Sequence, residues 1–272
     1  MNRILIVTPT LGESQFLERT IASVAKLPLP VIHVFSVPAH KQHALSAQYP
    51  GVRIVPDAGK AGGIYGALNA ALTQVPDGWE WFTYINDDDT LLDGFNAMVR
   101  RHLSSPQPEP VVYGDVDLID EDDRAISRIT IERNPKWIPS LLHQGISPLM
   151  QQGTIFRRDT VKKLGGFDLR YKLCADLDFW LRAYASGHKF KSYPIRVAQF
   201  RVRNGQLSGN TKMTIAEQDE IVARHLPVPV SSMKKTLGRL RYRACNLPRY
   251  IARFRRRGLQ TSYQLLQNES AK

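Results

Sequence analysis

Short apolar runs alternate with amphipathic segments of helix length through the first half of the chain. Apolar residues recurring every three or four positions predict helices at Phe16–Val24, Gly63–Val75 and Asp93–Leu103, and Ser14 is placed to cap the first. Strands separated by helices imply crossover connections, so we expect an α/β fold with a mainly parallel central sheet flanked by helices. The apolar runs that predict strands are Arg3–Thr8, Val31–Val37, Gly51–Val55, Trp81–Ile85 and a run opening at Val111–Tyr113.

The second half mixes short strands with helices. The acidic turn Asp120–Asp123 predicts a hairpin between Val116–Ile119 and Ala125–Ile131. A short helix ending at Leu164 is followed by two glycines, which commonly terminate helices. The other elements expected are strand Gln152–Phe156, helix Leu177–Ala185, the extended segment Lys191–Val202 and helix Thr214–His225.

The composition is that of an ordinary globular protein. With 272 residues, 43% of them hydrophobic, the chain is long enough for one large domain or for a domain with a tail. Its two cysteines, Cys174 and Cys245, are far apart and make neither a disulfide framework nor a zinc cluster, which favours a reducing cytoplasmic setting. No apolar run reaches the length of a signal-peptide core or a membrane span. We therefore expect a soluble protein or one bound peripherally to the inner face of the plasma membrane.

The formal net charge of +12 is concentrated near the C-terminus. Ten basic and no acidic residues lie between Lys234 and Arg257, which leaves about +2 for the rest of the chain. Leucines and aromatic residues accompany these cations, and Pro248 interrupts any single helix. The pattern predicts two short amphipathic helices on an anionic membrane, through residues 233–259. A solvated basic tail and a nucleic-acid patch are the alternatives. We expect a domain over residues 1–228 and a basic amphipathic C-terminal tail over 229–272.

Polar residues follow three of the predicted strands. Thr10 and Glu13 come after the first strand, Asp57 and Lys60 after the third, and Asn86 opens an acidic run after the fourth. Because parallel strands end at one edge of a sheet, and ligands bind beyond that edge, these side chains are expected to surround one site.

The acidic run consists of Asp87, Asp88 and Asp89. Adjacent carboxylates repel each other unless a cation or solvent offsets the repulsion. Mg²⁺ and Mn²⁺ prefer oxygen ligands, commonly one or two carboxylates together with substrate phosphates. The run therefore suggests a site for a metal and a diphosphate, whereas the alternative is a solvated turn in which Asp89 or Asp93 caps the next helix.

A glycine-rich stretch runs from Asp57 to Asn69. Its glycines allow a ligand to approach the backbone, and the helix that follows favours anions at its first turn. Asp57 is placed to accept a hydrogen bond from a base or ribose, and Lys60 to offset phosphate charge. The stretch matches neither a Walker loop nor a dinucleotide fingerprint. A glycine-rich loop without a ligand is the alternative.

Asp176 and Asp178 open the helix predicted near residue 177. Residues two apart do not share a helix face, so we expect one to point at a site and the other to cap the helix or pair with Arg182. The alternative is that both are structural.

Taken together, these segments resemble the family-2 glycosyltransferases of GT-A fold. The resemblance runs from about Arg3 to Ser208 in the order that the family shows. No one motif is specific, whereas the ordered set is. The matching motifs are Thr8-Pro9-Thr10, the stretch Pro56 to Asn69, Asn86 to Asp89, Tyr113-Gly114-Asp115, Gln152 to Arg158, Gly165 to Asp168, Asp176 to Arg182, and Gly205-Gln206-Leu207-Ser208.

The resemblance implies an inverting, metal-dependent transfer of sugar from a nucleotide-diphosphate sugar, with UDP the expected nucleotide. It implies a glycan or lipid-linked acceptor in bacterial-type cell-surface polysaccharide synthesis. We expect no nucleic acid partner, because the positive charge is confined to the tail. Asp176 matches the general base and Asp88 the Mg²⁺ or Mn²⁺ ligand. Residues 1–115 would bind the donor and 116–228 the acceptor. The expected donor contacts are Thr8, Pro9, Thr10, Glu13, Asp57, Lys60, Gly63, Asn69, Asn86 and Asp87, and the expected acceptor contacts are Asp115, Gln151 and Gln152.

Five positions depart from the family pattern. Asn86 replaces the first aspartate of a strict metal motif, and Ser36 stands where many members have aspartate. Ala175 stands where a glutamate often precedes the base, and Arg203-Asn204 replaces a frequent histidine. A non-catalytic homologue that binds nucleotide-sugar and a nucleotidyltransferase are the rival functions.

Overall fold

The computed structural model describes residues 3–203, 206 and 211–251, and nine strands among them form one sheet. The strands lie in the order β3-β2-β1-β4-β8-β6-β9-β5, with β7 paired to β6. Their bounds are β1 (Ile4–Pro9), β2 (Val31–Pro38), β3 (Arg53–Asp57), β4 (Trp81–Tyr84), β5 (Thr90–Leu91), β6 (Val111–Ile119), β7 (Ala125–Ile129), β8 (Thr154–Arg157) and β9 (Phe190–Arg201).

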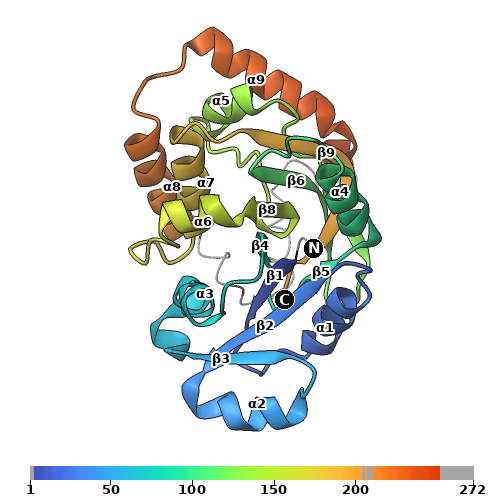
Figure 1. The fold of residues 1–272 in the computed structure, drawn as a ribbon. Coiled ribbons are helices and arrows are strands. Elements are labelled where there is room, and N and C mark those ends of the chain that lie inside the picture. The colour runs from blue at the N-terminus through green and yellow to red at the C-terminus, as the bar shows by residue number, and fades with distance from the viewer. Residues whose placement is uncertain (1–2, 204–205, 207–210, 252–272) are drawn as a thin grey trace, which may run out of the picture.

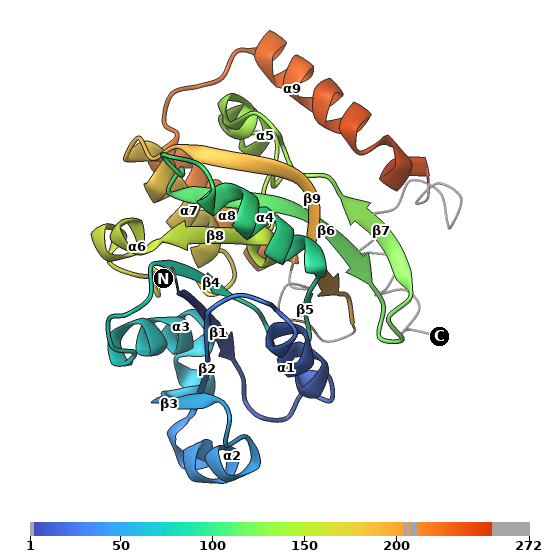
Figure 2. The same ribbon diagram turned by 45° about the vertical axis from the view of Figure 1, so that its right-hand side comes forward.

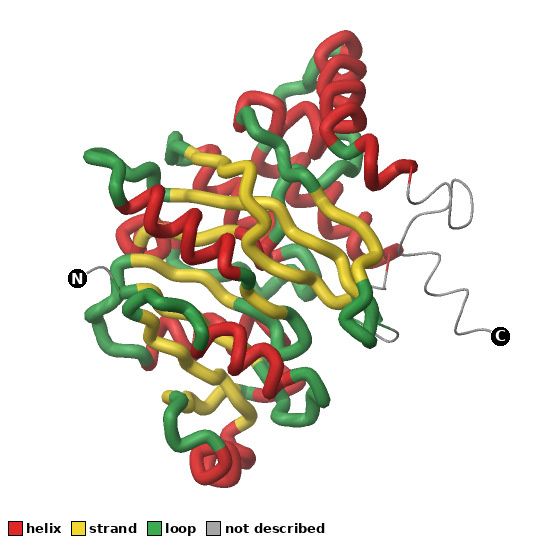
Figure 3. The backbone as a smooth tube through the Cα atoms, turned by 90° about the vertical axis from the view of Figure 1, so that its right-hand side faces the viewer, coloured by secondary structure: helices red, strands yellow, loops and turns green. Residues whose placement is uncertain are grey.

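The α-helices in the described part of the chain cover both faces of this sheet (Figures 1 and 3). They are α1 (Leu17–Ala25), α2 (Gln42–Gln48), α3 (Gly63–Gln74), α4 (Asp93–Leu103), α5 (Ile138–Leu142), α6 (Arg158–Leu164), α7 (Ala175–Ala185), α8 (Thr211–His225) and α9 (Ser232–Cys245). Short 3₁₀ turns are η1 (Ala39–Lys41), η2 (Gly59–Ala61), η3 (Pro135–Trp137) and η4 (Gln151–Gly153).

The first half of the sheet is parallel, as predicted. Strands β3, β2, β1 and β4 pair side by side in one direction. Their carboxyl ends therefore lie at one edge, which places the loops after Pro9, Asp57 and Tyr84 together. This edge is called the carboxyl edge below.

Beyond β4 the sheet is mixed. Strand β8 runs antiparallel to both β4 and β6, and β9 runs parallel to β6. The predicted hairpin is confirmed as β6 and β7, with the turn residue Asp123 at φ 65°. The expected α/β fold is confirmed, but the sheet is wholly parallel only in its first half, because the later strands are joined by hairpin and loop returns as well as by helices.

Two apolar clusters pack on opposite faces of the sheet. One joins the sheet to side chains of α3, α6, α7 and α8, including Leu68, Phe179 and Ile221. The other joins it to α1 and α4, including Val24 and Phe95. Burial on both faces explains why the parallel strands read as continuous apolar runs in the sequence.

Helices α2 and α9 lie at opposite ends of the molecule (Figure 1). Helix α9 runs along the outside of α5 (Figure 2). A turn at Asn246 follows α9, and residues 247–251 are again helical. Two helical segments near Pro248 were predicted, although part of the predicted second segment lies outside the described residues. Within the described ranges, no helix combines the length and apolar character needed to cross a membrane.

Candidate active site

Asp87, in the loop after β4, is hydrogen-bonded at the carboxyl edge to residues of the loop after β1. The Thr10 hydroxyl donates a 2.5 Å hydrogen bond to its carboxylate, and the Ser14 hydroxyl donates to its backbone oxygen at 2.8 Å. Ser14 is thus engaged with the acidic run and does not cap α1. Phe16 occupies the N-cap position of α1, and no side chain caps the helix there. Burial raises the pKa of Asp87. Thr10, Ser14 and Asp87 therefore form one hydrogen-bonded group.

Asp88 forms an ion pair with Arg203, one of the residues that depart from the family pattern. The Arg203 Nε lies 2.7 Å from the Asp88 carboxylate, and the Gln206 amide approaches the same oxygen at 3.4 Å. Asp88 is 5% exposed, so this charge is largely removed from water. The rest of the Gly205–Ser208 motif lies outside the described residues.

Asp89 is fully buried and is held by hydrogen bonds within the fold. It accepts hydrogen bonds from the backbone N–H of Arg201 and the side-chain amide of Gln152, both at 2.8 Å. Burial, with the neighbouring Asp88 charge, raises its pKa well above the usual value. The alternative that Asp89 caps α4 is wrong, because Leu92 occupies that position.

Arg201 is a buried residue that hydrogen-bonds to the acidic run. Its side chain is 0% exposed, its Nε donates to the Asp88 carbonyl at 2.9 Å, and another nitrogen pairs with Asp123 at 2.6 Å. Its guanidinium carbon also lies 4.2 Å from the centre of the Phe16 ring. Arg201 therefore fixes the backbone from which Asp88 projects.

The loop after β3 is held by Asp57. The Ser36 hydroxyl donates to its carboxylate at 2.8 Å, and the backbone N–H of Gly59 donates at 2.5 Å. Ser36, which departs from the family pattern, thus supports Asp57 from the neighbouring strand.

Two further residues predicted to bind the donor, Lys60 and Gly63, are exposed beside Asp57. Gly63 opens α3 with φ 64°, a conformation that favours glycine. Glu13 pairs with Lys41, which lowers the pKa of the Glu13 carboxyl, and Lys60 adds to the effect. Glu13 and Lys60, from the loops after β1 and β3, therefore lie near each other.

Two predicted donor contacts have structural partners instead. Thr8 is fully buried, and its hydroxyl lies 3.0 Å from His33 Nε2 on β2. The Asn69 amide makes two 2.8 Å hydrogen bonds with the backbone of Phe167, one as donor and one as acceptor. The donor roles of these two residues stay predictions, and in the protein alone both side chains are engaged within the fold. Pro9 is the last residue of β1 and is buried.

Asp176 lies in the first turn of α7. Its carboxylate accepts hydrogen bonds from the Leu177 backbone N–H at 2.8 Å and from the Tyr65 hydroxyl at 3.1 Å. Burial raises its pKa to about 6. Tyr65 belongs to α3, which leaves the carboxyl edge after Asp57, so this contact brings the start of α7 to that edge.

The Tyr84 hydroxyl is subject to the charges of both Asp176 and Asp89. Tyr84 is the last residue of β4, and burial together with the nearby Asp176 charge raises the pKa of its hydroxyl well above the ordinary value. Asp89 contributes to the same shift. The Tyr84 hydroxyl therefore lies within electrostatic reach of both carboxylates.

Asp178 takes the structural role expected of one of the two helix carboxylates. It is 1% exposed and pairs with Arg182 at 2.7 Å and with His225 at 2.8 Å. The predicted pairing with Arg182 is confirmed. Asp178 thus ties α7 to α8, while Asp176 faces Tyr65.

The predicted acceptor residues Gln151 and Gln152 are buried against the carboxyl edge. Their amide nitrogens donate to the Tyr84 carbonyl and to Asp89 respectively. Their carbonyl oxygens, like that of Asn86, are buried without a hydrogen-bond partner among the described residues. A buried acceptor without a donor is costly, so these three oxygens are suited to bind hydroxyls or a cation of a ligand.

Asp115, the third predicted acceptor residue, is charge-paired within the fold. Its carboxylate accepts from Arg133 at 2.6 Å and from the Ile131 backbone at 3.1 Å, and burial raises its pKa. These contacts connect β6 to the segment after β7.

The acidic run fits a metal only if a ligand completes the coordination. In the described part of the chain, no group of three or more His, Cys, Asp or Glu side chains is arranged to hold a metal ion. Mg²⁺ and Mn²⁺, however, are commonly bound by one or two carboxylates and substrate phosphates. Asp88 and the unpaired oxygen of Asn86 are compatible with that kind of site.

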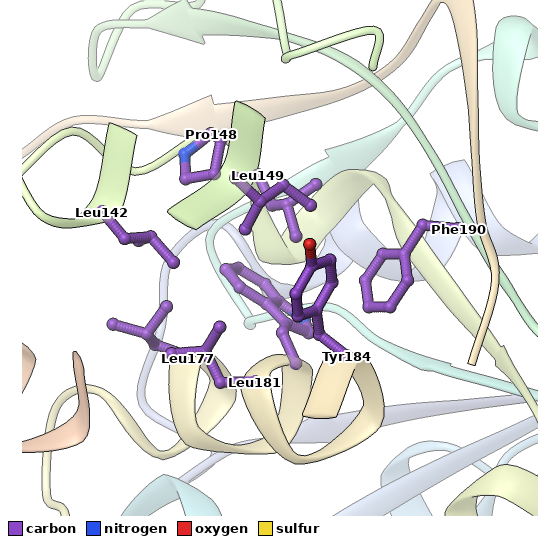
Figure 4. Close-up of a pocket in the computed structure, with 9 residues that line it drawn as sticks. Leu142, Pro148, Leu149, Leu177, Leu181, Tyr184 and Phe190 are labelled. Carbon is purple, nitrogen blue, oxygen red and sulfur yellow. The ribbon is translucent and has the colours of Figure 1, made fainter. Parts of the chain in front are cut away.

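A small pocket near α7 belongs to the core. Leu177, Leu181 and Tyr184 of α7 face Leu149 and Phe190 across it (Figure 4). All nine lining residues are apolar or aromatic, so the pocket offers no group to bind a charged diphosphate. The carboxyl edge remains the place where polar groups converge.

Comparison with known proteins identifies the family. A sequence model of the glycosyltransferase-like family 2 matches residues 2–223. The chain belongs to this family. The resemblance found in the sequence is thereby confirmed, and membership of this family supports a glycosyltransferase.

Curated family-2 relatives match part of the chain. Proteins from Mycobacterium tuberculosis and Mycobacterium bovis, each described as a PGL/p-HBAD biosynthesis glycosyltransferase, are 26% identical over 130 residues. The match covers 46% of this chain and 44% of each relative. The aligned part is therefore less than half the length of the curated relatives.

Solved structures show the GT-A fold. TarS of S. aureus in complex with UDP-GlcNAc superposes with a TM-score of 0.61 at 16% identity, covering 93% of this chain and 73% of that one. A longer TarS chain is covered to 44%. The mannosyltransferase PcManGT from Pyrobaculum calidifontis, in complex with GDP-Man and Mn²⁺, gives 0.59 at 13% identity, covering 98% and 79%.

Several residues of the site were not predicted. Tyr65 lies within the glycine-rich stretch, but its position there predicts no role. Arg203 stands where the family often has a histidine, which does not indicate that it pairs with Asp88. Arg201 gave no signal, because Lys191 and Arg196 are basic residues of the same extended segment and both are exposed.

Proposed function

We propose that this family-2 glycosyltransferase moves a sugar from a nucleotide-diphosphate sugar to an acceptor hydroxyl, with inversion at the anomeric carbon. Asp176 takes the hydroxyl proton as the acceptor oxygen forms its bond to that carbon. The bond from the anomeric carbon to the diphosphate oxygen breaks, and the nucleoside diphosphate leaves with the electron pair. One displacement inverts the centre.

The observation that carries the proposal is the contact between Tyr65 and Asp176. It brings a carboxylate with a pKa of about 6 to the edge that also holds the acidic run. A base is most effective when its pKa lies near the working pH. Asp178, two residues on, is ion-paired with Arg182 and hydrogen-bonded to His225, and is not available for this role.

Donor binding is assigned to the loops after β1, β3 and β4. Asp57 and Lys60 flank the glycine-rich turn, and Thr10 holds Asp87 in the loop after β4. UDP is the proposed nucleotide, since TarS, a structural neighbour, was solved with UDP-GlcNAc. The unpaired oxygens of Gln151 and Gln152 are proposed to accept hydrogen bonds from sugar hydroxyls, and Asp115 to position that wall of the site.

Asp88 is the proposed ligand of Mg²⁺ or Mn²⁺. Bound together with the donor diphosphate, such a cation would offset the charge of the leaving group as a Lewis acid. PcManGT, another structural neighbour, was solved with Mn²⁺. Arg203 already offsets the Asp88 charge from within the chain.

The acceptor class follows from the family resemblance. We propose a glycan or lipid-linked acceptor of a cell-surface polysaccharide, and contact of the basic C-terminal segment 233–259 with a membrane.

The proposal is tested first by donor binding. The full chain is heated with each of a panel of nucleotide-sugars in the presence of Mn²⁺. A donor at 100 times its Kd should add about 2.7 kcal/mol to the free energy of unfolding. A UDP-sugar is expected to give the largest rise, and no rise with any member would overturn the assignment of the site.

The second test measures transfer. With the donor so found, Asp176→Asn is expected to reduce turnover about 10²–10⁴-fold while donor binding is retained. Asp77→Asn is the matched control, because Asp77 precedes β4 at the opposite edge and is exposed. Turnover near wild type in Asp176→Asn would disprove the base, and binding without any turnover by the wild type would indicate the non-catalytic homologue.

A further inference from the structure

In the described part of the chain, helix α9 is fixed to the domain by one face. Gly238 lies so close to α5 that an added Cβ would stand 2.6 Å from the Ser140 Oγ, and Tyr242 is buried one turn later. Asn246 exchanges two 2.9 Å hydrogen bonds with the backbone of Thr130. These residues are spaced by four, so they lie on one side of the helix.

The opposite side of α9 presents an exposed apolar stripe. Met233 is 80% exposed, Leu237 54%, Leu240 58%, Leu247 55% and Ile251 44%. Ala244, also exposed, completes a spacing of three or four residues along the whole stripe. With about 3.6 residues per turn, this spacing places Met233, Leu237, Leu240 and Ala244 on the side of α9 away from Gly238 and Tyr242. Leu247 and Ile251 follow in the short helical segment after the turn at Asn246. Leaving such a stripe in water is unfavourable.

Cations border the stripe on both sides. Helical spacing places Arg239 and Arg243 along one border and Lys234 and Arg241 along the other. Arg241 also reaches Glu132 at 3.3 Å. Residues 231–251 contain six basic and no acidic side chains. An apolar stripe between two rows of cations matches a bilayer surface, with apolar groups inserted and cations at the headgroups.

We propose that this outer face of α9 docks on an anionic lipid bilayer. The helix lies flat in the interface, with the stripe from Met233 to Ile251 inserted among the lipids. Its inner face keeps the domain attached through α5 and Thr130. Since α9 is already folded and docked in the protein, binding orders no new helix, and the bilayer approaches the domain from the α9 side.

The charges favour a bilayer over protein or nucleic acid partners. A second copy packed on the same stripe would bring the cations of two α9 helices close together. The segment has no acidic side chains to offset their mutual repulsion. Nucleic acid would satisfy the cations but leave Leu237 and Leu240 in water. An anionic bilayer satisfies both features of the face.

The test is flotation of the full chain with vesicles of phosphatidylglycerol and phosphatidylcholine, compared with phosphatidylcholine alone. Binding to the anionic vesicles is expected, with loss at high salt. Leu237→Glu/Leu240→Glu should weaken the partition at least tenfold. Arg239→Ala/Arg243→Ala should weaken it about 25-fold, since each cation near such a surface contributes about fivefold.

Ile215→Glu on α8 is the matched control, because Ile215 is 58% exposed, as is Leu240. It should bind as the wild type does. Equal binding to both vesicle types, or unchanged binding of the leucine variant, would overturn the proposal. The proposal would also be overturned if the wild type were a dimer and Leu237→Glu/Leu240→Glu were a monomer that still bound vesicles as the wild type does. Circular dichroism establishes that each variant is folded, and the assay needs no donor, so its outcome is independent of the proposed transfer.

Discussion

The hydroxyl of Tyr65 lies 3.1 Å from the carboxylate of Asp176, 111 positions further along the chain. The same hydroxyl lies 2.9 Å from the Leu173 carbonyl, just before α7. Tyr65 thus holds both the start of α7 and the proposed base against α3. Because the phenol hydroxyl favours the ionised carboxylate, it works against the burial that raises the pKa of Asp176.

Removing the Tyr65 hydroxyl is expected to change the pH dependence of transfer. Wild-type turnover should rise with pH through about 6, as Asp176 loses its proton. Tyr65→Phe removes a hydrogen bond to the charged form, so the pKa of Asp176 rises and the rising limb moves up by about one pH unit. The measurement is the pH–rate profile with saturating donor.

A matched tyrosine controls that experiment. Tyr49 donates to Glu18 at 2.8 Å, on the α1 and α2 side of the molecule. Tyr49→Phe should leave the profile unchanged. A Tyr65→Phe limb at or below the wild-type position would contradict the assignment of Asp176 as base.

Asp176→Asn is expected to stabilise the protein at neutral pH. The folded pKa of about 6 lies above the ordinary value of about 3.9, so the carboxyl contributes stability only in its protonated form. That contribution is lost as pH rises from about 4 through 6. At pH 7.5 the variant should therefore exceed the wild type by about 1–3 kcal/mol in urea unfolding, and by less at pH 4.5.

Asp77→Asn should behave in the opposite way. The Lys162 hydrogen bond lowers the pKa of Asp77, so its contribution to stability is present at neutral pH and is lost on acidification. If both asparagine variants changed stability in the same direction at pH 7.5, the environment assigned to Asp176 would be wrong.

Arg203 is expected to compete with a metal ion for Asp88. Their 2.7 Å ion pair places a guanidinium on the carboxylate proposed to bind Mn²⁺. Arg203→Gln removes the competing cation, so Mn²⁺ alone should bind about three- to tenfold more tightly. Titration followed by the electron paramagnetic resonance signal of free Mn²⁺ measures this directly.

Two controls frame the Mn²⁺ titration. Asp88→Asn should abolish the site. Arg196→Gln, which removes an exposed arginine paired with Asp117 at 3.1 Å, should leave the affinity unchanged. Weaker Mn²⁺ binding in Arg203→Gln would show that Arg203 supports the site and does not compete for it.

Gly166→Ala is expected to be more destabilising than Gly165→Ala. Both glycines have positive φ, 86° and 75°, so both changes carry a backbone cost of about 1 kcal/mol. At Gly166 the added Cβ would stand 2.6 Å from the Asn69 Oδ1, which is held by Phe167, whereas open space surrounds Gly165. Gly166→Ala should cost about 1–3 kcal/mol more in urea unfolding. Equal losses would show that Asn69 yields freely.

The sequence predicted helices and strands well where buried apolar residues recur at regular intervals along the chain. The bounds of β1 and α4 lie within about two residues of the structure, since apolar periodicity reports burial directly. Helix α6 ends at Leu164, as the two glycines after it predicted. Helix α2, with the sequence Gln-His-Ala-Leu-Ser-Ala-Gln, was not predicted, because only Leu45 of its seven residues is buried. The antiparallel strand β8 was found as a strand, but its direction depends on partners far away in sequence.

By itself, the sequence determined the alternating elements, the polar residues at strand ends and the family. Those features are local, because strand periodicity, glycine conformation and carboxylate clustering involve neighbouring residues. Only the tertiary structure decided that Asp178 is ion-paired while Asp176 meets Tyr65, that Arg201 and Arg203 converge on Asp88, and that Asn69 faces Phe167. Each of these depends on side-chain direction and on charges brought together by folding, which spacing along a chain does not specify.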